Sequence, residues 1–256
     1  MKLCLDFGNS QLFGGLVRGR KILFRFRKNM SKSISSDEMG IFLRDVIREN
    51  GYELSTVKKI IFCSVTPDVN HSVKNSCRNY FRIIPLALEP GVKTGLQIKY
   101  ANPTEVGADR IAGALGASEA YPGQNIIIVD LGTATTIDVL TKNKEYLGGV
   151  ITPGMSISMQ SLEQHTAKLP KVEILKPKSI CGKSTVQSIQ AGLYFGNLGA
   201  IKEICKRLKT SCFPDEEALI LGTGGFSRLF MEAGIFDQVN KDLVLEGLIK
   251  LEELNR

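Results

Sequence analysis

Two short segments of the chain place acids, glycine and hydroxyl side chains together. The first is DFGNS at residues 6–10, and the second is DLGT at residues 130–133. Glycine lets backbone N–H groups approach a phosphate oxygen closely, and the neighbouring amide and hydroxyl side chains add further donors. Because the carboxylates would repel phosphate, their natural role is to hold a neutralising cation. The two segments together predict a pair of phosphate-binding turns bridged by cations.

The spacing of these turns indicates an internal duplication. Asp6 and Asp130 lie close to half of the 256-residue chain apart. Apolar patterns predict strands at 2–7, 12–18, 21–27 and 59–64 and helices at 37–50 and 69–80, with Ser36 or Asp37 as the N-cap of the first helix. The pattern then restarts, with strands at 126–130, 135–140, 145–151 and 218–221 and helices at 155–168, 185–209 and 246–253. The repeat predicts an α/β chain of two similar domains, residues 1–118 and 119–256.

The composition is that of an ordinary globular protein. Hydrophobic residues make up 43% of the chain and charged residues 23%, which argues against disordered and fibrous classes. The formal net charge of +7 favours anionic partners. No window approaches the roughly 18–20 apolar residues of a membrane helix, so we expect no membrane association. The six cysteines never fall in C-x-x-C spacing, so we expect no zinc site or disulfide framework, and a cytoplasmic location.

One basic segment, RGRKILFRFRK at residues 18–28, could bind nucleic acid. Phe24 and Phe26 alternate with Arg25 and Arg27, and aromatic side chains between arginines can stack on bases. The same alternation has a period of two, which is typical of a strand with one solvated face. We favour the strand and expect no nucleic-acid partner.

A third motif, VGADR at residues 106–110, could supply a general base. A carboxylate that accepts the proton of an attacking alcohol typically accelerates the reaction by about 10²- to 10⁴-fold, and Asp109 is the best candidate for this role. Arg110 is suited to a carboxylate substrate, because a guanidinium can donate two hydrogen bonds to it. The alternative is a solvated pair that begins a helix over residues 111–120, where an acid in the first turn is favourable. The motif taken alone favours this alternative.

Five motifs, in order along the chain, resemble one family. They are DFGNS, VGADR, DLGTATTID at 130–138, GGVITPG at 148–154 and TAKLP at 166–170, and together they are similar to the motifs of type III pantothenate kinases. The resemblance favours catalysis over a solvated pair at Asp109. It implies an α/β fold of duplicated ribonuclease H-like domains of the actin-like ATPase superfamily, with mixed sheets flanked by helices. It also implies transfer of the γ-phosphate of ATP to the primary hydroxyl of pantothenate, the first step toward coenzyme A.

The resemblance further assigns residues to roles. It implies Asp109 as the catalytic base and Asp130 as the ligand of a monovalent cation, K⁺ or NH₄⁺. The divalent metal that accompanies ATP, Mg²⁺ or another, is assigned to Asp6. ATP is expected to contact Asp6, Phe7, Gly8, Asn9, Ser10, Gln11, Leu12, Phe13 and Thr133. Pantothenate is expected to contact Tyr100, Gly107, Ala108, Asp109, Arg110 and Thr185. The glycine-rich LILGTGGFS at 219–227 is a suitable place for the adenosine. Family members are homodimers whose substrate pocket lies at the subunit interface.

Two other classes of function stay open. A non-catalytic regulator of the same fold would bind nucleotide without turnover, but such a protein has no need of a base at Asp109. Another sugar or acid kinase, or an exopolyphosphatase, of the same superfamily is disfavoured by VGADR followed by GGVITPG. The family usually has threonine where this chain has Ser10, and serine keeps the hydroxyl.

Overall fold

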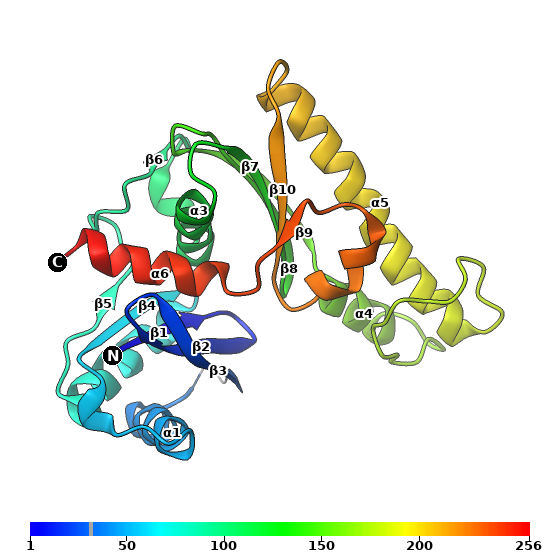
Figure 1. The fold of residues 1–256 in the computed structure, drawn as a ribbon. Coiled ribbons are helices and arrows are strands. Elements are labelled where there is room, and N and C mark those ends of the chain that lie inside the picture. Colours follow the sequence, from blue (N-terminus) through cyan, green and yellow to red (C-terminus); the bar gives the residue numbers. More distant parts are fainter. Residues whose placement is uncertain (31–32) are drawn as a thin grey trace. The chain divides into compact units, whose positions relative to one another are not determined.

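The computed structural model describes residues 1–30 and 33–256, which form two compact units (Figure 1). The first unit comprises Met1–Leu96, Ala101–Ala120 and Leu243–Arg256, and the second comprises Gln97–Tyr100 and Tyr121–Asp242. Across these described residues, no helix is both long enough and apolar enough to span a membrane.

The first unit is a mixed five-stranded sheet of order β3–β2–β1–β4–β5 with helices on both faces. β1 pairs antiparallel with β2 and parallel with β4. The strands are β1 (Lys2–Phe7), β2 (Gln11–Arg18), β3 (Lys21–Asn29), β4 (Lys59–Ser64) and β5 (Leu86–Ala87). The helices are α1 (Ser36–Glu49), α2 (Pro67–Ser76), α3 (Ala108–Ala120) and α6 (Leu243–Leu254), with short helical turns η1 (Leu54–Thr56), η2 (Cys77–Phe81) and η3 (Pro103–Glu105).

Strand alternation divides the first unit into two cores. Phe7 of β1 and Phe62 of β4 pack on the side of α1 and α2, whereas Cys4 and Cys63 pack on the side of α3 and α6. Successive side chains of a strand point to opposite faces, so Asp6 shares the face of Cys4. The aspartate of the first turn therefore lies on the α3 side of the sheet.

The second unit repeats this topology. Its six-stranded sheet has the order β11–β10–β7–β8–β9–β6, and β7 pairs antiparallel with β8 and parallel with β10. The strands are β6 (Gln97–Ile98), β7 (Asn125–Leu131), β8 (Ala134–Leu140), β9 (Glu145–Pro153), β10 (Ala218–Thr223) and β11 (Gln238–Val239). The helices are α4 (Met155–Gln164), α5 (Thr185–Cys212) and the 3₁₀ helix η4 (Ser227–Ala233). Apart from the additional edge strand β6, both units share one strand order, which confirms the predicted duplicated α/β fold.

Most predicted elements are present, and the differences lie at their ends. The N-cap of α1 is Ser35, so the prediction of Ser36 or Asp37 is wrong. The Glu38 N–H donates to Ser35 Oγ at 3.1 Å, and the Ser35 N–H donates to the Glu38 carboxylate at 2.8 Å. This reciprocal capping box explains why the helix begins at Ser36. Other ends differ as well. For example, α4 ends at Gln164 and not at residue 168, and α3 begins at Ala108 and not at residue 111.

The last helix belongs with the first unit. The sequence groups residues 119–256 together, whereas α6 packs on α3 in the first unit and β6 pairs with β9 in the second. Two glycines permit the close contact of α3 with α6. A Cβ on Gly247 would lie 1.8 Å from the Ala112 carbonyl oxygen, and one on Gly116 would lie 2.1 Å from the Leu243 carbonyl oxygen. The two helices therefore touch backbone to backbone.

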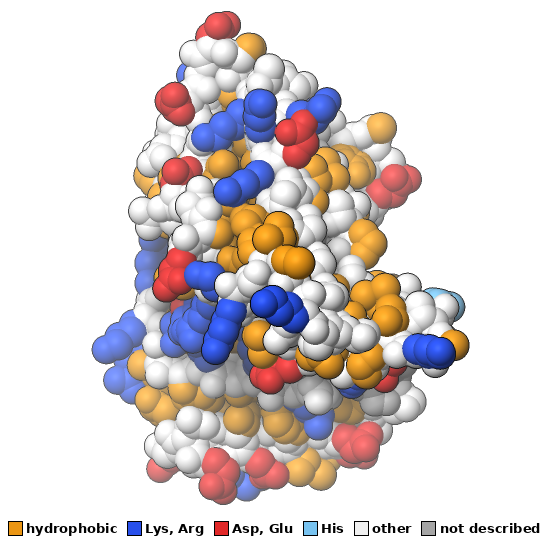
Figure 2. Space-filling view, turned by 90° about the vertical axis from the view of Figure 1, so that its right-hand side faces the viewer, with side chains coloured by type: hydrophobic (Ala, Val, Ile, Leu, Met, Phe, Trp, Pro, Cys, Tyr) orange, Lys and Arg blue, Asp and Glu red, His pale blue; other side chains and the backbone are white. Residues whose placement is uncertain are grey.

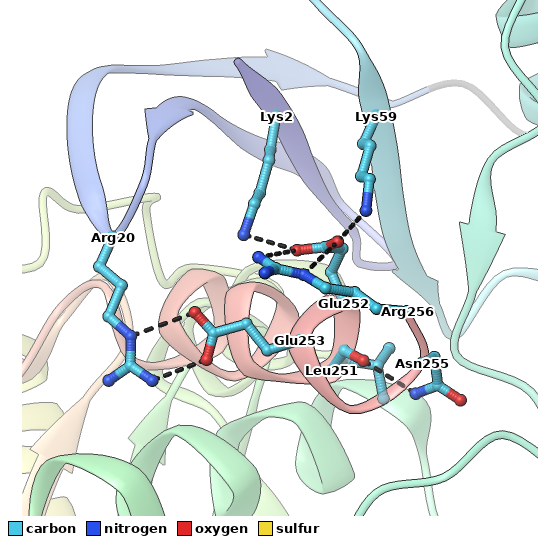
Figure 3. Close-up of polar contacts among 8 residues, drawn as sticks. All are labelled: Lys2, Arg20, Lys59, Leu251, Glu252, Glu253, Asn255 and Arg256. Carbon is cyan, nitrogen blue, oxygen red and sulfur yellow. Dashed lines mark hydrogen bonds and ion pairs between the residues drawn. The ribbon is translucent and has the colours of Figure 1, made fainter.

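A buried carboxylate also ties α6 to the sheet (Figure 3). Glu252 is 3% exposed; it accepts hydrogen bonds from Lys59 and from Arg256 Nε at 3.1 Å, and pairs with Lys2 at 2.6 Å. Burial alone would raise the pKa of this carboxyl. The hydrogen bonds from Arg256, Lys2 and Lys59 outweigh it and hold the pKa of Glu252 at about 2. The neighbouring Glu253 pairs instead with an exposed arginine.

We expect Glu252→Gln to lower the free energy of unfolding at pH 7 by about 2–4 kcal/mol, because it leaves three cations around a neutral amide. The folded pKa lies below the ordinary value of 4.5, so the stabilisation is present above pH 4.5 and is lost as the pH falls toward 2. Urea denaturation of the wild-type protein and of Glu252→Gln between pH 7 and pH 3 measures the difference between their free energies of unfolding, which is expected to become smaller as the pH falls. Glu253→Gln is the matched control and is expected to cost less than about 1 kcal/mol. Equal losses for the two variants would contradict the role of Glu252.

Candidate active site

The first predicted phosphate-binding turn joins β1 to β2 in the first unit. The Gly8 N–H donates to the carbonyl oxygen of Gln11 at 3.0 Å and closes a tight turn. Asn9 and Ser10 form its tip, and both are exposed. The turn therefore carries two polar side chains at an exposed tip, the kind of loop at which phosphate can bind.

The residues that flank this turn differ in what they offer a ligand. Phe7 and Leu12 are fully buried in the core on the α1 side, so their side chains are structural and only their backbone groups can meet a nucleotide. Phe13 is half-buried, and the Arg27 guanidinium lies 4.3 Å from its ring centroid. The family resemblance assigns all of residues 6–13 to ATP contacts, and burial now separates the residues whose side chains are structural from those whose side chains are accessible.

Residues 64–66, which comprise the last residue of β4 and the two that follow it, pack against this turn although no motif marks them. The Val65 N–H donates to the Phe7 carbonyl at 3.0 Å, and the Thr66 hydroxyl donates to the Gly8 carbonyl at 3.3 Å. The position of these residues in the sheet is the signal that could have found them. Because β4 is parallel to β1, the carboxyl ends of both strands meet at one edge, where ligands of α/β sheets commonly bind.

The charges of two carboxylates act on one buried thiol in the first unit. Cys63 Sγ donates to Asp6 Oδ1 at 3.4 Å. Burial raises the pKa of the Cys63 thiol well above its usual value, and the negative charges of Asp6 and Asp109 raise it further. The thiol therefore stays protonated and remains a donor. The fold brings together Asp6 of the first turn and Asp109 of the VGADR motif.

Asp109 lies in the first turn of α3. The Arg110 N–H donates to Asp109 Oδ1 at 2.7 Å, and the N-terminal end of a helix favours a negative charge. Gly107 makes room for the carboxylate, because a Cβ there would lie 2.6 Å from Asp109 Oδ1 and 3.5 Å from Val65 Cγ1. Gly107 to Arg110 thus lie beside residues 64–66, and through them beside the first turn.

The second predicted turn follows β7 in the second unit and is held between two glycines. A Cβ on Gly154 would lie 2.2 Å from the carbonyl oxygen of Thr133. A Cβ on Gly224, whose φ is +86°, would lie 2.3 Å from Asp130 Oδ1. Only glycine fits at these two positions without displacing the turn. The LILGTGGFS segment, predicted to hold adenosine, is therefore packed against Asp130.

The donor set of these turns fits the cations that the sequence predicts. Within residues 1–30 and 33–256, no three His, Cys, Asp or Glu side chains are grouped to hold a metal ion. Mg²⁺ bound with a nucleotide needs fewer protein ligands, since one or two carboxylates act with phosphates and waters. Asp6, close to the second carboxylate at Asp109, fits that requirement. Asp130 offers an oxygen beside the backbone of Gly224, which fits a hard monovalent cation.

The remaining predicted substrate contacts, Tyr100 and Thr185, belong to the second unit. The Tyr100 ring lies over Gly148, where a Cβ would be 3.2 Å from the ring. Thr185 begins α5, is exposed, and lines a groove of about 700 Å³ between α4 and α5. Apolar side chains such as Ile157 and Leu193 line the same groove. Figure 2, which faces the α5 side, shows apolar side chains gathered among lysines and arginines.

Comparison with known proteins decides the family. The sequence profile described as "Type III pantothenate kinase" matches residues 2–207. A protein of that name from Legionella pneumophila (strain Paris) is 51% identical over 248 residues, which cover 97% of this chain and 96% of the relative. The chain belongs to the type III pantothenate kinase family. The part that matches the type III pantothenate kinase profile contains both turns, the VGADR motif, Tyr100 and Thr185.

Solved structures of more distantly related sequences have the same fold as this chain. A Campylobacter jejuni protein described as a "conserved putative Baf family transcriptional activator" aligns with a TM-score of 0.63 at 21% identity, over 99% of this chain and 98% of that one. A "Putative N-acetylglucosamine Kinase" from Porphyromonas gingivalis aligns with a TM-score of 0.53 at 14% identity, over 100% and 99%. At these identities the likeness shows the fold alone, and it agrees with the α/β architecture described above.

Proposed function

We propose that this chain transfers the γ-phosphate of ATP to pantothenate, giving 4′-phosphopantothenate and ADP in the first step of coenzyme A biosynthesis. Membership of the family supports the reaction. The observation that carries the mechanism is the packing of Gly107, two residues before Asp109, against Val65, whose N–H donates to the Phe7 carbonyl beside the first turn. It supports Asp109 as a base beside the proposed phosphate-binding turn, and phosphoryl transfer depends mainly on such positioning. No observation favours a regulator without turnover.

We assign the two turns to the phosphates of ATP. The tip of the first turn supplies backbone N–H groups with Asn9 and Ser10, and Thr133 supplies a hydroxyl in the second. Asp6 is the proposed ligand of the divalent metal, which neutralises phosphate charge when it is bound. The bare backbone at Gly225, where an added Cβ would meet nothing within 4 Å, leaves room for the adenosine.

We assign proton transfer to Asp109. Its carboxylate takes the proton of the primary hydroxyl of pantothenate as that oxygen bonds to the γ-phosphorus. The bond from phosphorus to the bridging oxygen breaks, and ADP leaves with its electron pair. Arg110 donates two hydrogen bonds to the pantothenate carboxylate. Gly107 and Ala108 contribute the neighbouring backbone, and Tyr100 and Thr185 are further proposed contacts.

We also propose a homodimer that completes the pantothenate pocket, located in the cytoplasm. The groove beside Thr185, together with Ile157 at 39% exposed and Val186 at 42% exposed, supports a contact with a second copy on this face. Full activity at a gel-filtration mass near one 28.1 kDa chain would refute the shared pocket. Cell fractionation tests the location.

The reaction and its cation requirement are tested in one assay. We expect ADP release from ATP and Mg²⁺ that depends on pantothenate in potassium buffer and is at least severalfold slower in sodium buffer, because Asp130 is the proposed ligand of K⁺ or NH₄⁺. A panel of sugars and short acids is the control for the acceptor. No pantothenate-dependent ADP in potassium would overturn the proposed function. Equal rates in potassium and sodium would overturn only the cation assignment.

A further inference from the structure

One face of the sheet in the second unit carries a row of polar side chains. Asp130 of β7 stands opposite Thr136 of β8 in the strand register, and Asp138 follows two residues later on the same face. The other face, where Ile137 is buried, packs against α4 and α5. The row therefore lies on the same face of the sheet as Asp130, the proposed cation ligand. Asp138 has no role in the function proposed above.

Asp138 is a buried carboxylate with specific partners. It is 2% exposed, and Tyr146 is fully buried. Tyr146 Oη donates to Asp138 Oδ1 at 2.6 Å, the length of a hydrogen bond from a hydroxyl to a charged carboxylate. Thr136 Oγ1 donates to Asp138 Oδ2 at 3.3 Å. Since a buried charge is costly unless it is hydrogen-bonded, these bonds hold Asp138 and Tyr146 in one geometry.

The Tyr146 ring in turn supports Tyr100. The two ring centroids are 6.4 Å apart with 47° between the ring planes. The backbone beside Tyr100 is fixed as well, because the Lys99 N–H donates to the Tyr146 carbonyl at 2.8 Å. Gly148, with φ at +120°, lies under the Tyr100 ring and would press on it if it carried a side chain. The orientation of Tyr100 is thus set by β9 and by Tyr146.

We propose that Tyr146 and Asp138 are positioning residues that fix the Tyr100 ring and thereby set the affinity for pantothenate. The proposal rests on the proposed function, in which Tyr100 contacts pantothenate. Both residues are buried and act only through Tyr100. A ring that can tilt must be ordered when the substrate binds, and that ordering reduces affinity. Proton transfer by Asp109 is unaffected, so the effect falls on KM and not on kcat.

Tyr146→Phe tests this directly, because it removes the hydroxyl and keeps the ring. We expect the KM for pantothenate to rise about 5- to 10-fold, within the range that one ordinary intramolecular hydrogen bond contributes. The kcat and the KM for ATP stay within about twofold. Asp138→Asn, which keeps the shape and one acceptor oxygen, gives a smaller rise. The control is Tyr194→Phe, which removes the same atom from a tyrosine 2% exposed and stacked on Phe230.

A double-mutant cycle separates positioning from a merely structural role. In a Tyr100→Ala background, Tyr146→Phe is expected to change the KM for pantothenate by less than about twofold, since its effect passes through Tyr100. An unchanged KM for Tyr146→Phe alone, or a full additional effect in the Tyr100→Ala background, overturns the proposal. If Tyr146→Phe does not melt cooperatively, Asp138→Asn carries the same cycle. A wild-type protein without pantothenate-dependent ADP release instead overturns the proposed function.

Discussion

Asp109→Asn is expected to lower kcat by about 10²- to 10⁴-fold, the usual contribution of a general base, while ATP binding stays nearly unchanged. Asparagine keeps the size of the side chain and can still accept the Arg110 N–H, but it cannot take the proton of an alcohol. The loss therefore falls on the transfer step. Steady-state kinetics with pantothenate, combined with nucleotide binding measured by calorimetry, checks both parts.

The competing explanation is that Asp109 only begins α3, and a matched variant separates the two. Asp37 lies in the first turn of α1 in the same unit, is exposed, and accepts a hydrogen bond from the Tyr80 hydroxyl at 2.9 Å. Asp37→Asn makes the same chemical change at another helix start, where an acid contributes about 0.3–1 kcal/mol of stability. We expect it to leave kcat unchanged. A wild-type rate for Asp109→Asn would remove Asp109 from catalysis.

Local patterns predicted the elements that carry the site. β1 and β4 have the predicted bounds, because a short run of alternating or continuous apolar residues that ends at a polar turn leaves little freedom in their placement. The two turns were predictable as turns, since an acid and a glycine after a buried strand are typical of a tight turn, and their occurrence twice at a domain-scale spacing is what favoured phosphate binding. The residue types therefore predicted each turn separately.

Features that depend on a distant partner could not be predicted in this way. β5, β6 and β11 contain two residues each, too few to show a period, and they pair because a neighbouring strand offers an edge. The segment at 64–66 carries no motif of its own and contributes through its place beside β1. The position of Cys63 near both Asp6 and Asp109 follows from strand pairing and from the docking of α3.

The terminal helix α6 is the clearest example of a feature that depends on a distant part of the chain. Its apolar residues extend almost all round, so the pattern indicates that α6 is buried without naming what covers it. Helix propensity treats Gly247 as a defect in the middle of the helix. In the structure it is the point at which α6 meets the backbone of α3, and that contact assigns the helix to the first unit.

Gly247→Ala is accordingly expected to destabilise the first unit by about 3 kcal/mol or more, at the upper end of overpacking costs. The added Cβ would lie 1.8 Å from the carbonyl oxygen of Ala112, and helical backbone on both sides cannot turn away as a side chain could. Thermal unfolding followed by circular dichroism checks this, and the expected fall in Tm is on the order of 10 °C for a unit of this size.

A comparison of Gly247→Ala with Gly199→Ala distinguishes packing from helix propensity by the sign of the change in stability. Gly199 lies in α5, is exposed, and has nothing within 4 Å of an added Cβ. Alanine there is expected to stabilise the helix by up to about 1 kcal/mol. If Gly247→Ala were neutral or stabilising as well, propensity alone would account for both glycines. A large loss at Gly247 with a gain at Gly199 shows that the contact between α3 and α6 requires glycine.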